Sequence, residues 1–195
     1  MKINILEYLE ESARRYTDKI ALADDKNSVT FGQWEAYARS IGSEIIRQTS
    51  GTVRNPVLVF VDRRIEGLVA FAGVVESGNF YVPIDCKMPP ERIRLITDVL
   101  NPVAAVYVTD KDRDALESIG FGGVTLKYDD AITCSPDSGC IADIRRGMID
   151  LDPLYSIFTS GSTGVPKGVV ITHRGCIDLS EWLVSTFGFT SDDNL

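Results

Sequence analysis

Apolar residues along the chain follow two patterns: short continuous runs, and longer stretches in which they recur every three or four positions. Near the N-terminus Ile5, Leu6, Leu9 and Ala13 follow the second pattern, which predicts a helix over residues 3–16. The short runs predict strands. Helices are expected at 3–16, from residue 30 or 32 through 45, and at 65–76, 91–100, 112–119 and 175–187; strands are expected at 20–23, 29–31, 57–61, 80–84, 103–108, 124–126, 154–158 and 168–172.

One of the runs, residues 57–61, is apolar at every position. A strand with apolar side chains on both faces is typical of the centre of a parallel sheet that helices cover on both sides. Strands and helices also alternate along the chain, as they do in α/β proteins. The sequence therefore predicts an α/β fold with a largely parallel sheet flanked by helices. Residues 129–150 mix Asp, Ser, Gly and Pro, and are expected to form an irregular surface connection with one short strand.

The most informative segment is a loop between two predicted strands, with the sequence F-T-S-G-S-T-G-V-P-K-G over residues 158–168. Its glycines, Gly161, Gly164 and Gly168, let the backbone adopt positive φ and approach a ligand closely. Consecutive backbone N–H groups in such a turn can form an anion-binding nest, and Lys167 adds a positive charge. Further donors come from the hydroxyl groups of Thr159, Ser160, Ser162 and Thr163. Together these groups suit a polyphosphate ligand.

Two common nucleotide motifs do not describe this loop. A Walker A loop reads G-x-x-x-x-G-K-S/T, whereas here Pro166 precedes Lys167 and Gly168 follows it. The chain also has no G-x-G-x-x-G, so the dinucleotide fingerprint is missing. A bare G-S-T-G would be interpreted as a flexible loop beside an incidental lysine, but the complete string of residues 158–168 is too specific for that interpretation.

Charge and composition narrow the class of protein. The chain has 28 acidic and 20 basic residues, a net charge of −8, which argues against nucleic acid as the main partner because phosphate backbones bind Lys/Arg surfaces. One nucleotide remains compatible, since it needs only a few N–H groups and one or two cations. No uncharged apolar run approaches the roughly 18 residues of a membrane span. Glu7 interrupts the N-terminus before a signal-like apolar segment forms, so a cytoplasmic protein with no membrane partner is expected.

The cysteines do not suggest a metal centre. Cys86, Cys134, Cys140 and Cys176 form no C-x-x-C pair and are isolated in sequence from His173, the only histidine, so a zinc site is not expected. A bridge between Cys134 and Cys140 would close a small loop, but four reduced thiols are the expectation for a cytosolic chain.

Residues 159–168 resemble the phosphate-loop signature of the adenylate-forming superfamily of acyl-CoA synthetases, luciferases and adenylation domains, roughly Y/F-T-S-G-S/T-T-G-x-P-K-G, and match every fixed position. Two earlier segments match in order: V-T-F-G-Q-W at 29–34, and E-S-G-N-F-Y-V-P-I-D at 76–85, which resembles K-A-G-x-A-Y-V-P-I/L-D and precedes P-x-E-R-I/L. The departures are Glu76 and Ser77 for Lys-Ala, Asn79 for a small residue, and Cys86 after the aspartate. The second motif favours the amino-acid-activating branch: nonribosomal-peptide adenylation domains and D-alanine–carrier-protein ligases.

The resemblance implies a reaction in which a carboxylate attacks the α-phosphorus of ATP, pyrophosphate leaves, and a thiol takes the acyl group from the acyl-adenylate. The implied partners are ATP, Mg²⁺, an amino acid or another carboxylate, and a carrier-protein phosphopantetheine or CoA thiol. Thr159 is also the candidate Mg²⁺ contact. The implied phosphate-binding residues are Thr159, Ser160, Gly161, Ser162, Thr163, Gly164, Lys167 and Gly168.

Five further residues are expected to be structural. His173 follows a predicted strand and is expected to pack near the next helix. Tyr81 and Asp85 are expected to serve sheet packing and a turn, and Trp34 and Trp182 are expected in the core.

Members of the superfamily continue well past the point that corresponds to residue 195, through the adenine, ribose and magnesium motifs to a C-terminal lid with a catalytic lysine. Residues 1–195 are therefore expected to be a truncated N-terminal subdomain of the large domain, with no catalytic residue of its own, no adenylation activity alone, and exposed apolar surface. Two alternatives stay open: a fragment of an acyl-CoA synthetase-type ligase, and a non-catalytic protein that keeps this subdomain for binding or as a scaffold.

Overall fold

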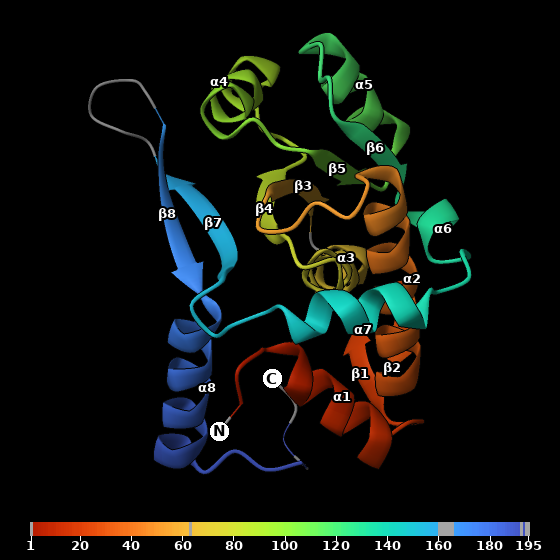
Figure 1. Ribbon diagram of the computed structural model, residues 1–195, viewed down its shortest axis with the longest axis vertical. Helices are drawn as coiled ribbons and strands as arrows, with labels where there is room; N and C mark the ends of the chain where they lie inside the picture. Colours follow the sequence, from red (N-terminus) through yellow and green to blue (C-terminus); the bar gives the residue numbers. More distant parts are fainter. Residues whose placement is uncertain (1, 63, 160–165, 192, 194–195) are drawn as a thin grey trace.

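The computed structural model describes residues 2–62, 64–159, 166–191 and 193, and its centre is a six-stranded sheet (Figure 1). The strand order is β6-β5-β3-β4-β7-β8. Neighbours from β6 to β7 run parallel, and β8 runs antiparallel to β7. This confirms the predicted α/β fold with a largely parallel sheet. The strands are β3 (Pro56–Val61), β4 (Phe80–Asp85), β5 (Ala104–Tyr107), β6 (Val124–Lys127), β7 (Pro153–Thr159) and β8 (Lys167–Thr172).

Helices cover both faces of the sheet because its central strand is apolar on both. Val57 and Val59 of β3 pack against α2 and α3, whereas Leu58 and Phe60 pack against α4 and α5. All four side chains are almost completely buried, as predicted for a central strand. In Figure 1, α4 and α5 lie above the strands and α3 lies below them. The helices are α2 (Phe31–Gln48), α3 (Ile65–Glu76), α4 (Pro90–Leu100) and α5 (Asp110–Ser118).

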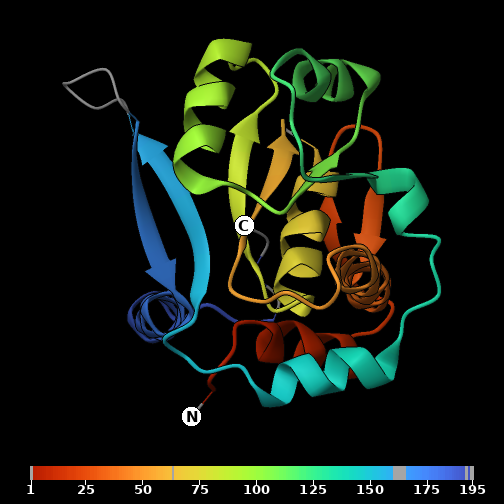
Figure 2. The same ribbon diagram turned by 45° about the horizontal axis from the view of Figure 1, so that its top comes forward.

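Smaller elements pack on the outer side of α2 and α3 (Figure 2). They are α1 (Leu6–Arg15), α7 (Ser138–Arg146) and a two-stranded antiparallel sheet of β1 (Ile20–Ala23) and β2 (Ser28–Thr30). The start of α2 is fixed by a capping box: the Thr30 hydroxyl accepts from Gln33 N–H at 3.2 Å, and the Gln33 side chain accepts from Thr30 N–H at 2.9 Å. Thr30, one of the two predicted starting points, is therefore the N-cap.

The prediction for residues 129–150 is wrong, because this stretch contains helices and no strand. A short helix, α6 (Tyr128–Ala131), leads into it, and α7 (Ser138–Arg146) follows. The Asp137 carboxylate caps α7 by accepting from Gly139 N–H and Cys140 N–H, both at 3.0 Å. The polar residues that suggested a loop form the cap and the solvent face of the helix, and Ile141 is buried on the inner face.

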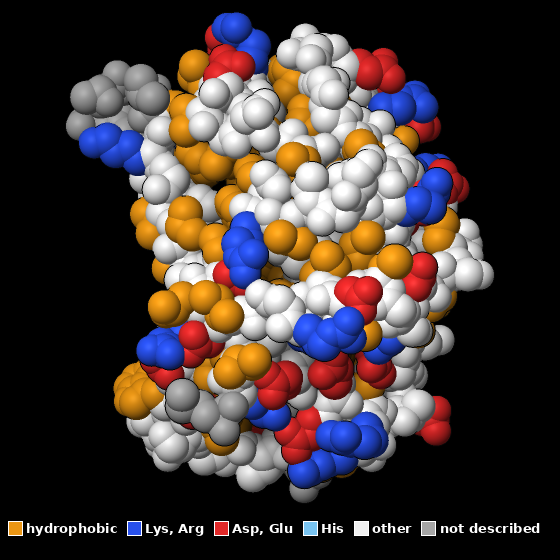
Figure 3. Space-filling model, in the orientation of Figure 1, with side chains coloured by type: hydrophobic (Ala, Val, Ile, Leu, Met, Phe, Trp, Pro, Cys, Tyr) orange, Lys and Arg blue, Asp and Glu red, His pale blue; other side chains and the backbone are white. Residues whose placement is uncertain are grey.

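The last helix, α8 (His173–Phe187), is less buried than predicted. The expected apolar stripe is half-buried at Cys176 and Leu183, while Leu179 and Phe187 are 54% and 61% exposed. The helix packs on the body mainly through its first turns, where His173 and Ile177 are buried. Apolar side chains therefore gather on the flank formed by β8 and α8 (left in Figure 3), which confirms the expectation of exposed apolar surface.

No helix in the described ranges is long and apolar enough to span a membrane. The four cysteines are free thiols. Among the described residues no three His, Cys, Asp or Glu side chains are grouped so that they would hold a metal ion.

Candidate functional site

The two ends of the predicted phosphate-binding loop are brought together by the β7–β8 hairpin. Thr159 lies opposite Lys167, and Phe158 lies opposite Gly168 in the antiparallel register. The Thr159 hydroxyl also lies 3.5 Å from the Lys167 carbonyl oxygen, to which it donates. Of the sequence-predicted site residues, Thr159, Lys167 and Gly168 are thus placed side by side at the end of the hairpin. The other predicted site residues lie outside the described residues: Ser160, Gly161, Ser162, Thr163 and Gly164.

The base of this hairpin depends on a close approach between two strands. A Cβ atom at Gly168 would lie 2.8 Å from Cζ of Phe158 and 3.1 Å from Oγ of Ser156. The Phe158 ring itself packs against the core cluster between the sheet, α4 and α5. Glycine at position 168 therefore lets β8 close over the phenyl ring. This packing role was not predicted, and the signal for it would have been the aromatic residue and the glycine at facing positions of two strands joined by a loop.

The exposed end of the hairpin is chemically suited to an anion. Lys167 is exposed and, among the described residues, has no carboxylate within ion-pairing distance. Its charge is therefore free to meet a phosphate group. The hydroxyl of Thr159 keeps its acceptor lone pairs while it donates to the Lys167 carbonyl, so it can serve as an oxygen ligand for a metal ion. The same hydroxyl can donate to a phosphate oxygen if it gives up this long contact. Both side chains point to anion binding, and neither supplies an acid or a base.

His173 is a buried structural residue at the first position of α8. Its Nδ1 accepts from the backbone N–H of Ile5 at 3.2 Å, and its Nε2 is buried with no hydrogen-bond partner in the described part of the chain. Burial lowers the pKa of His173 to about 4, with Asp152 acting in the opposite direction and Arg145 in the same one. The imidazole is thus neutral at neutral pH, and the predicted structural role is supported.

Four further residues were expected to have structural roles, and the structure agrees for three of them, Tyr81, Asp85 and Trp34. Tyr81 of β4 stacks on Phe71 of α3 at 4.0 Å between ring centroids, so it packs the sheet against that helix. The Asp85 carboxylate accepts from Lys87 N–H at 2.8 Å and so forms a turn after β4. Trp34 is half-buried and packs against the core. Trp182 is 55% exposed, so its predicted place in the core is wrong, because nothing in the described chain covers that side of α8.

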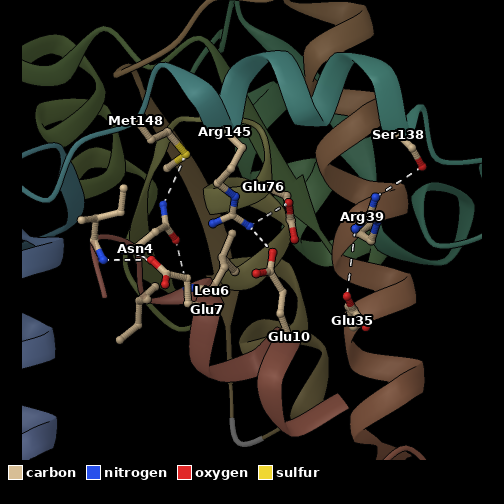
Figure 4. A network of polar contacts seen from close by, with 12 residues as sticks. Asn4, Leu6, Glu7, Glu10, Glu35, Arg39, Glu76, Ser138, Arg145 and Met148 are labelled. Atoms are coloured by element: carbon tan, nitrogen blue, oxygen red, sulfur yellow. Dashed lines mark hydrogen bonds and ion pairs between the residues drawn. The ribbon is translucent and has the colours of Figure 1, made fainter. Parts of the chain in front are cut away.

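A partly buried ion-pair network, which the sequence did not predict, joins three helices (Figure 4). Arg145 of α7 reaches Glu10 of α1 at 2.6 Å and Glu76 at the end of α3 at 3.5 Å. The Glu76 side chain is 1% exposed, and its burial raises the pKa of that carboxyl while Arg145 lowers it. The network positions α7 against α1 and α3. In the described part of the chain, this network lies away from the end of the hairpin and from the predicted phosphate-binding residues Thr159 and Lys167.

The chain belongs to the AMP-binding enzyme family, whose sequence model it matches over residues 9–195. Its relatives include the D-alanine–D-alanyl carrier protein ligase of Lactiplantibacillus plantarum, 29% identical over 98% of this chain and 36% of the ligase. Tyrocidine synthase 1 of Brevibacillus parabrevis is 26% identical over 98% of this chain and 17% of that protein. The resemblance to the amino-acid-activating branch is therefore confirmed, and this chain spans about a third of the ligase and less of the synthase.

Solved structures agree with these relatives. The nonribosomal peptide synthetase FmoA3, with alpha-methyl-L-serine-AMP bound, superposes with a TM-score of 0.83 at 26% identity, over 98% of this chain and 20% of that one. VinN superposes with a TM-score of 0.81 at 16% identity, over 99% of this chain and 52% of that one, which shows the shared fold. The phosphate-binding assignments of individual residues stay predictions.

Proposed function

We propose that this chain is the N-terminal part of the large domain of an ATP-dependent amino-acid-activating ligase, and that its β7–β8 hairpin holds the β- and γ-phosphates of ATP. The observation that carries the proposal is the hairpin itself, whose register sets Thr159 and Lys167 opposite each other at the two ends of one loop. Among the described residues the exposed Lys167 has no ion-pair partner. Membership of the AMP-binding family supports ATP as the nucleotide.

In the proposed reaction the carboxylate of an amino acid attacks the α-phosphorus of ATP. The bond from this phosphorus to the bridging oxygen breaks, pyrophosphate leaves, and an aminoacyl-adenylate forms. A phosphopantetheine thiol of a carrier protein then takes the aminoacyl group and releases AMP. Lys167 would stabilise the negative charge on the departing pyrophosphate. Backbone N–H and hydroxyl groups of residues 159–164 would act as neutral hydrogen-bond donors, and Gly168 would let the backbone approach the phosphates closely.

The described residues at the loop suit Mg²⁺ that is already bound to the phosphates of the nucleotide, rather than a site made by the protein alone. Mg²⁺ prefers oxygen ligands and keeps several waters, so one or two protein oxygens suffice when phosphates supply the rest. The Thr159 hydroxyl is the described group at the loop that would reach it. When bound, Mg²⁺ would neutralise phosphate charge during the transfer.

The 195-residue chain alone is proposed to bind polyphosphate without turning over. The ligase relative is nearly three times as long as the part that this chain matches, and the amino-acid pocket and thiol-transfer steps are assigned to that further polypeptide. The acceptor in the relative from Lactiplantibacillus plantarum is, by its name, a D-alanyl carrier protein. A carrier-protein thiol is accordingly proposed here in preference to CoA.

The test is calorimetry of the chain with inorganic pyrophosphate and with MgATP, comparing Lys167→Gln with the matched control Lys127→Gln at the opposite edge of the sheet. Loss of one charge-assisted contact is expected to weaken binding about tenfold or more in the first variant only. Absence of binding, or equal effects of both substitutions, contradicts the proposed phosphate site. On the full-length polypeptide, pyrophosphate exchange that depends on an amino acid is expected. Exchange that depends on a fatty or aryl acid, together with transfer of the acyl group to CoA, would favour the acyl-CoA synthetase alternative.

A further inference from the structure

The β7–β8 hairpin is attached to the parallel strands less regularly than those strands are attached to one another. In the described part of the chain β4 and β7 share one registered pair, Tyr81 opposite Tyr155, whereas β3 and β4 are paired over their whole length. Two apolar side chains of β7, Leu154 and Phe158, also pack the hairpin onto the core. Apolar contacts have little directional preference, so further, directional contacts are needed to fix the angle of the hairpin.

Directional contacts of this kind lie at the base of the hairpin, on Asp152. The side chain of Asp152 is 9% exposed, and its two carboxylate oxygens accept from the guanidinium of Arg54, from Nε at 2.7 Å and from Nη2 at 3.2 Å. The Asp152 carbonyl accepts from His173 N–H at 3.2 Å. Asp152 immediately precedes β7 and His173 immediately follows β8, so a single residue links Arg54 to the base of both strands.

Arg54 is itself fixed to the parallel part of the sheet. It lies just before β3, and its backbone N–H donates to the Gly78 carbonyl, in the turn before β4, at 2.8 Å. Its φ is 59°, a left-handed conformation that is unfavourable for a residue with a side chain. Its Nη2 also donates to the Gly147 carbonyl at 2.9 Å. Because the planar fork of arginine fixes distance and direction together, Arg54 joins the hairpin to β3 and β4 at a defined angle.

The base and the phosphate-binding end of the hairpin lie at opposite edges of the sheet (Figure 2). β7 runs parallel to β4 and has seven residues, so its two ends are about 20 Å apart at the usual rise per residue. Over this length a rotation of about 5° at the base displaces Thr159 and Lys167 by about 1.7 Å. Hydrogen-bond lengths vary by only about 0.5 Å, so such a displacement is enough to break contacts with a bound phosphate.

We propose that Arg54 is a positioning residue for the phosphate site: through its fork on Asp152 it sets the angle of the β7–β8 hairpin and thereby the position of Lys167 at the phosphates of ATP. This role rests on the proposed phosphate-binding function of the hairpin. The charge of Arg54 does not act on the ligand directly, because a separation of about 20 Å is twice the Debye length of about 10 Å at about 0.1 M salt.

The test uses the 195-residue chain and the substitution Arg54→Lys, which keeps the charge and loses the fork. Arg113→Lys on α5 is the matched control, because Arg113 is equally exposed, at 46%, and its ion pairs in the described structure lie within that one helix. Arg54→Gly is a second variant, since glycine removes the fork and suits the left-handed backbone. Thermal unfolding verifies that each variant is folded at the temperature of the binding measurement.

Calorimetry with inorganic pyrophosphate measures the effect on the site. Arg54→Lys and Arg54→Gly are expected to weaken binding about threefold or more, and Arg113→Lys less than about twofold. If Arg54 acts by placing Lys167, its substitution is expected to lose most of this effect in a chain that already carries Lys167→Gln. A structural perturbation that does not act through Lys167 would make the two effects additive, and additivity overturns the proposal.

Residual dipolar couplings of backbone amides measure the orientation of the hairpin without any ligand. The couplings of β7 and β8 are expected to change relative to those of β3 in Arg54→Lys and Arg54→Gly, and to stay the same in Arg113→Lys. A hairpin that keeps its orientation in both Arg54 variants overturns the proposal. A parent chain that binds no pyrophosphate overturns the phosphate site, and with it the role of Arg54 there; the couplings distinguish this outcome from a hairpin whose angle Arg54 does not set.

Discussion

Burial of a neutral histidine makes the fold sensitive to acid. His173 has no exposed surface, and its Nδ1 accepts the backbone N–H of Ile5, so protonation of Nδ1 would break that bond and place a charge in the interior. The position at the N-terminal end of α8 adds a further cost, because the positive end of the helix dipole disfavours a cation. The unfolded chain meets none of these penalties and takes up the proton at the ordinary pKa.

The sign and size of the effect follow from linkage. Between pH 6.5 and about 4 the unfolded state binds a proton at position 173 that the folded state does not bind, so stability is fully present above pH 6.5 and is lost as the pH falls. At about 1.4 kcal/mol per pH unit, a pKa lowered from 6.5 to about 4 corresponds to a loss of about 3 kcal/mol. This is a substantial part of the free energy of unfolding of a domain of this size.

Urea unfolding at a series of pH values from 8 to 4 measures the effect, with His173→Gln as the comparison. Glutamine keeps an acceptor for Ile5 N–H and does not titrate. Subtraction of the two curves removes the contribution of carboxylates, including Glu76, whose raised pKa acts in the opposite direction because its burial penalty is relieved as it protonates. We expect the parent to lose about 3 kcal/mol relative to the variant over this range. Parallel curves for the two proteins would refute the reasoning.

Two further predictions concern the close packing at Gly168 and the ion pair of Arg145. Gly168→Ala is expected to lower the free energy of unfolding by about 1–3 kcal/mol, because the added Cβ meets the Phe158 ring. The double variant with Phe158→Leu is expected to regain part of this loss. A double-mutant cycle by thermal unfolding measures the coupling, and a coupling of zero would contradict the prediction. Arg145→Ala is expected to lower the free energy of unfolding by about 3 kcal/mol, because it leaves the buried Glu76 carboxylate unpaired. The loss is expected to be smaller at pH 5 than at pH 8, since burial raises the pKa of Glu76 and the protonated carboxyl carries no buried charge. The exposed control, Arg146→Ala, is expected to change the free energy of unfolding by less than about 0.5 kcal/mol.

The central part of the fold was predictable because each signal there is local and strong. The all-apolar run of β3 indicates burial on both faces, and the mostly apolar stretch at 65–76 predicts a buried helix with the observed bounds of α3, Ile65–Glu76. The exposed face of α8 could not be predicted in the same way. Periodicity shows that Leu179 and Phe187 share an apolar side, but it contains no information on whether another element covers that side.

The candidate site was predictable as a motif and not as a geometry. The string of residues 158–168 is enough to predict an anion-binding loop and to point to the family that the chain belongs to. The antiparallel direction of β8, by contrast, depends on how the hairpin closes, and the contact of Phe158 with Gly168 follows from that closure. The loop chemistry is thus encoded locally, while the support of the loop is a property of two strands packed on a core.

The wrong prediction for residues 129–150 and the unpredicted ion pair between Arg145 and Glu76 concern the same helix, α7. Glu76 stands where the family has a lysine, at the C-terminal end of a buried helix, where both burial and the helix dipole disfavour a negative charge. Such a carboxylate needs a cation from another element, and the basic residues nearest in the unassigned stretch are Arg145 and Arg146. Arg145 faces inward on the same side of α7 as the buried Ile141, four positions away, whereas Arg146 is exposed. In the structure α7 brings Arg145 to 3.5 Å from the Glu76 carboxylate, so this helix supplies a positive charge where the sequence departs from the family motif.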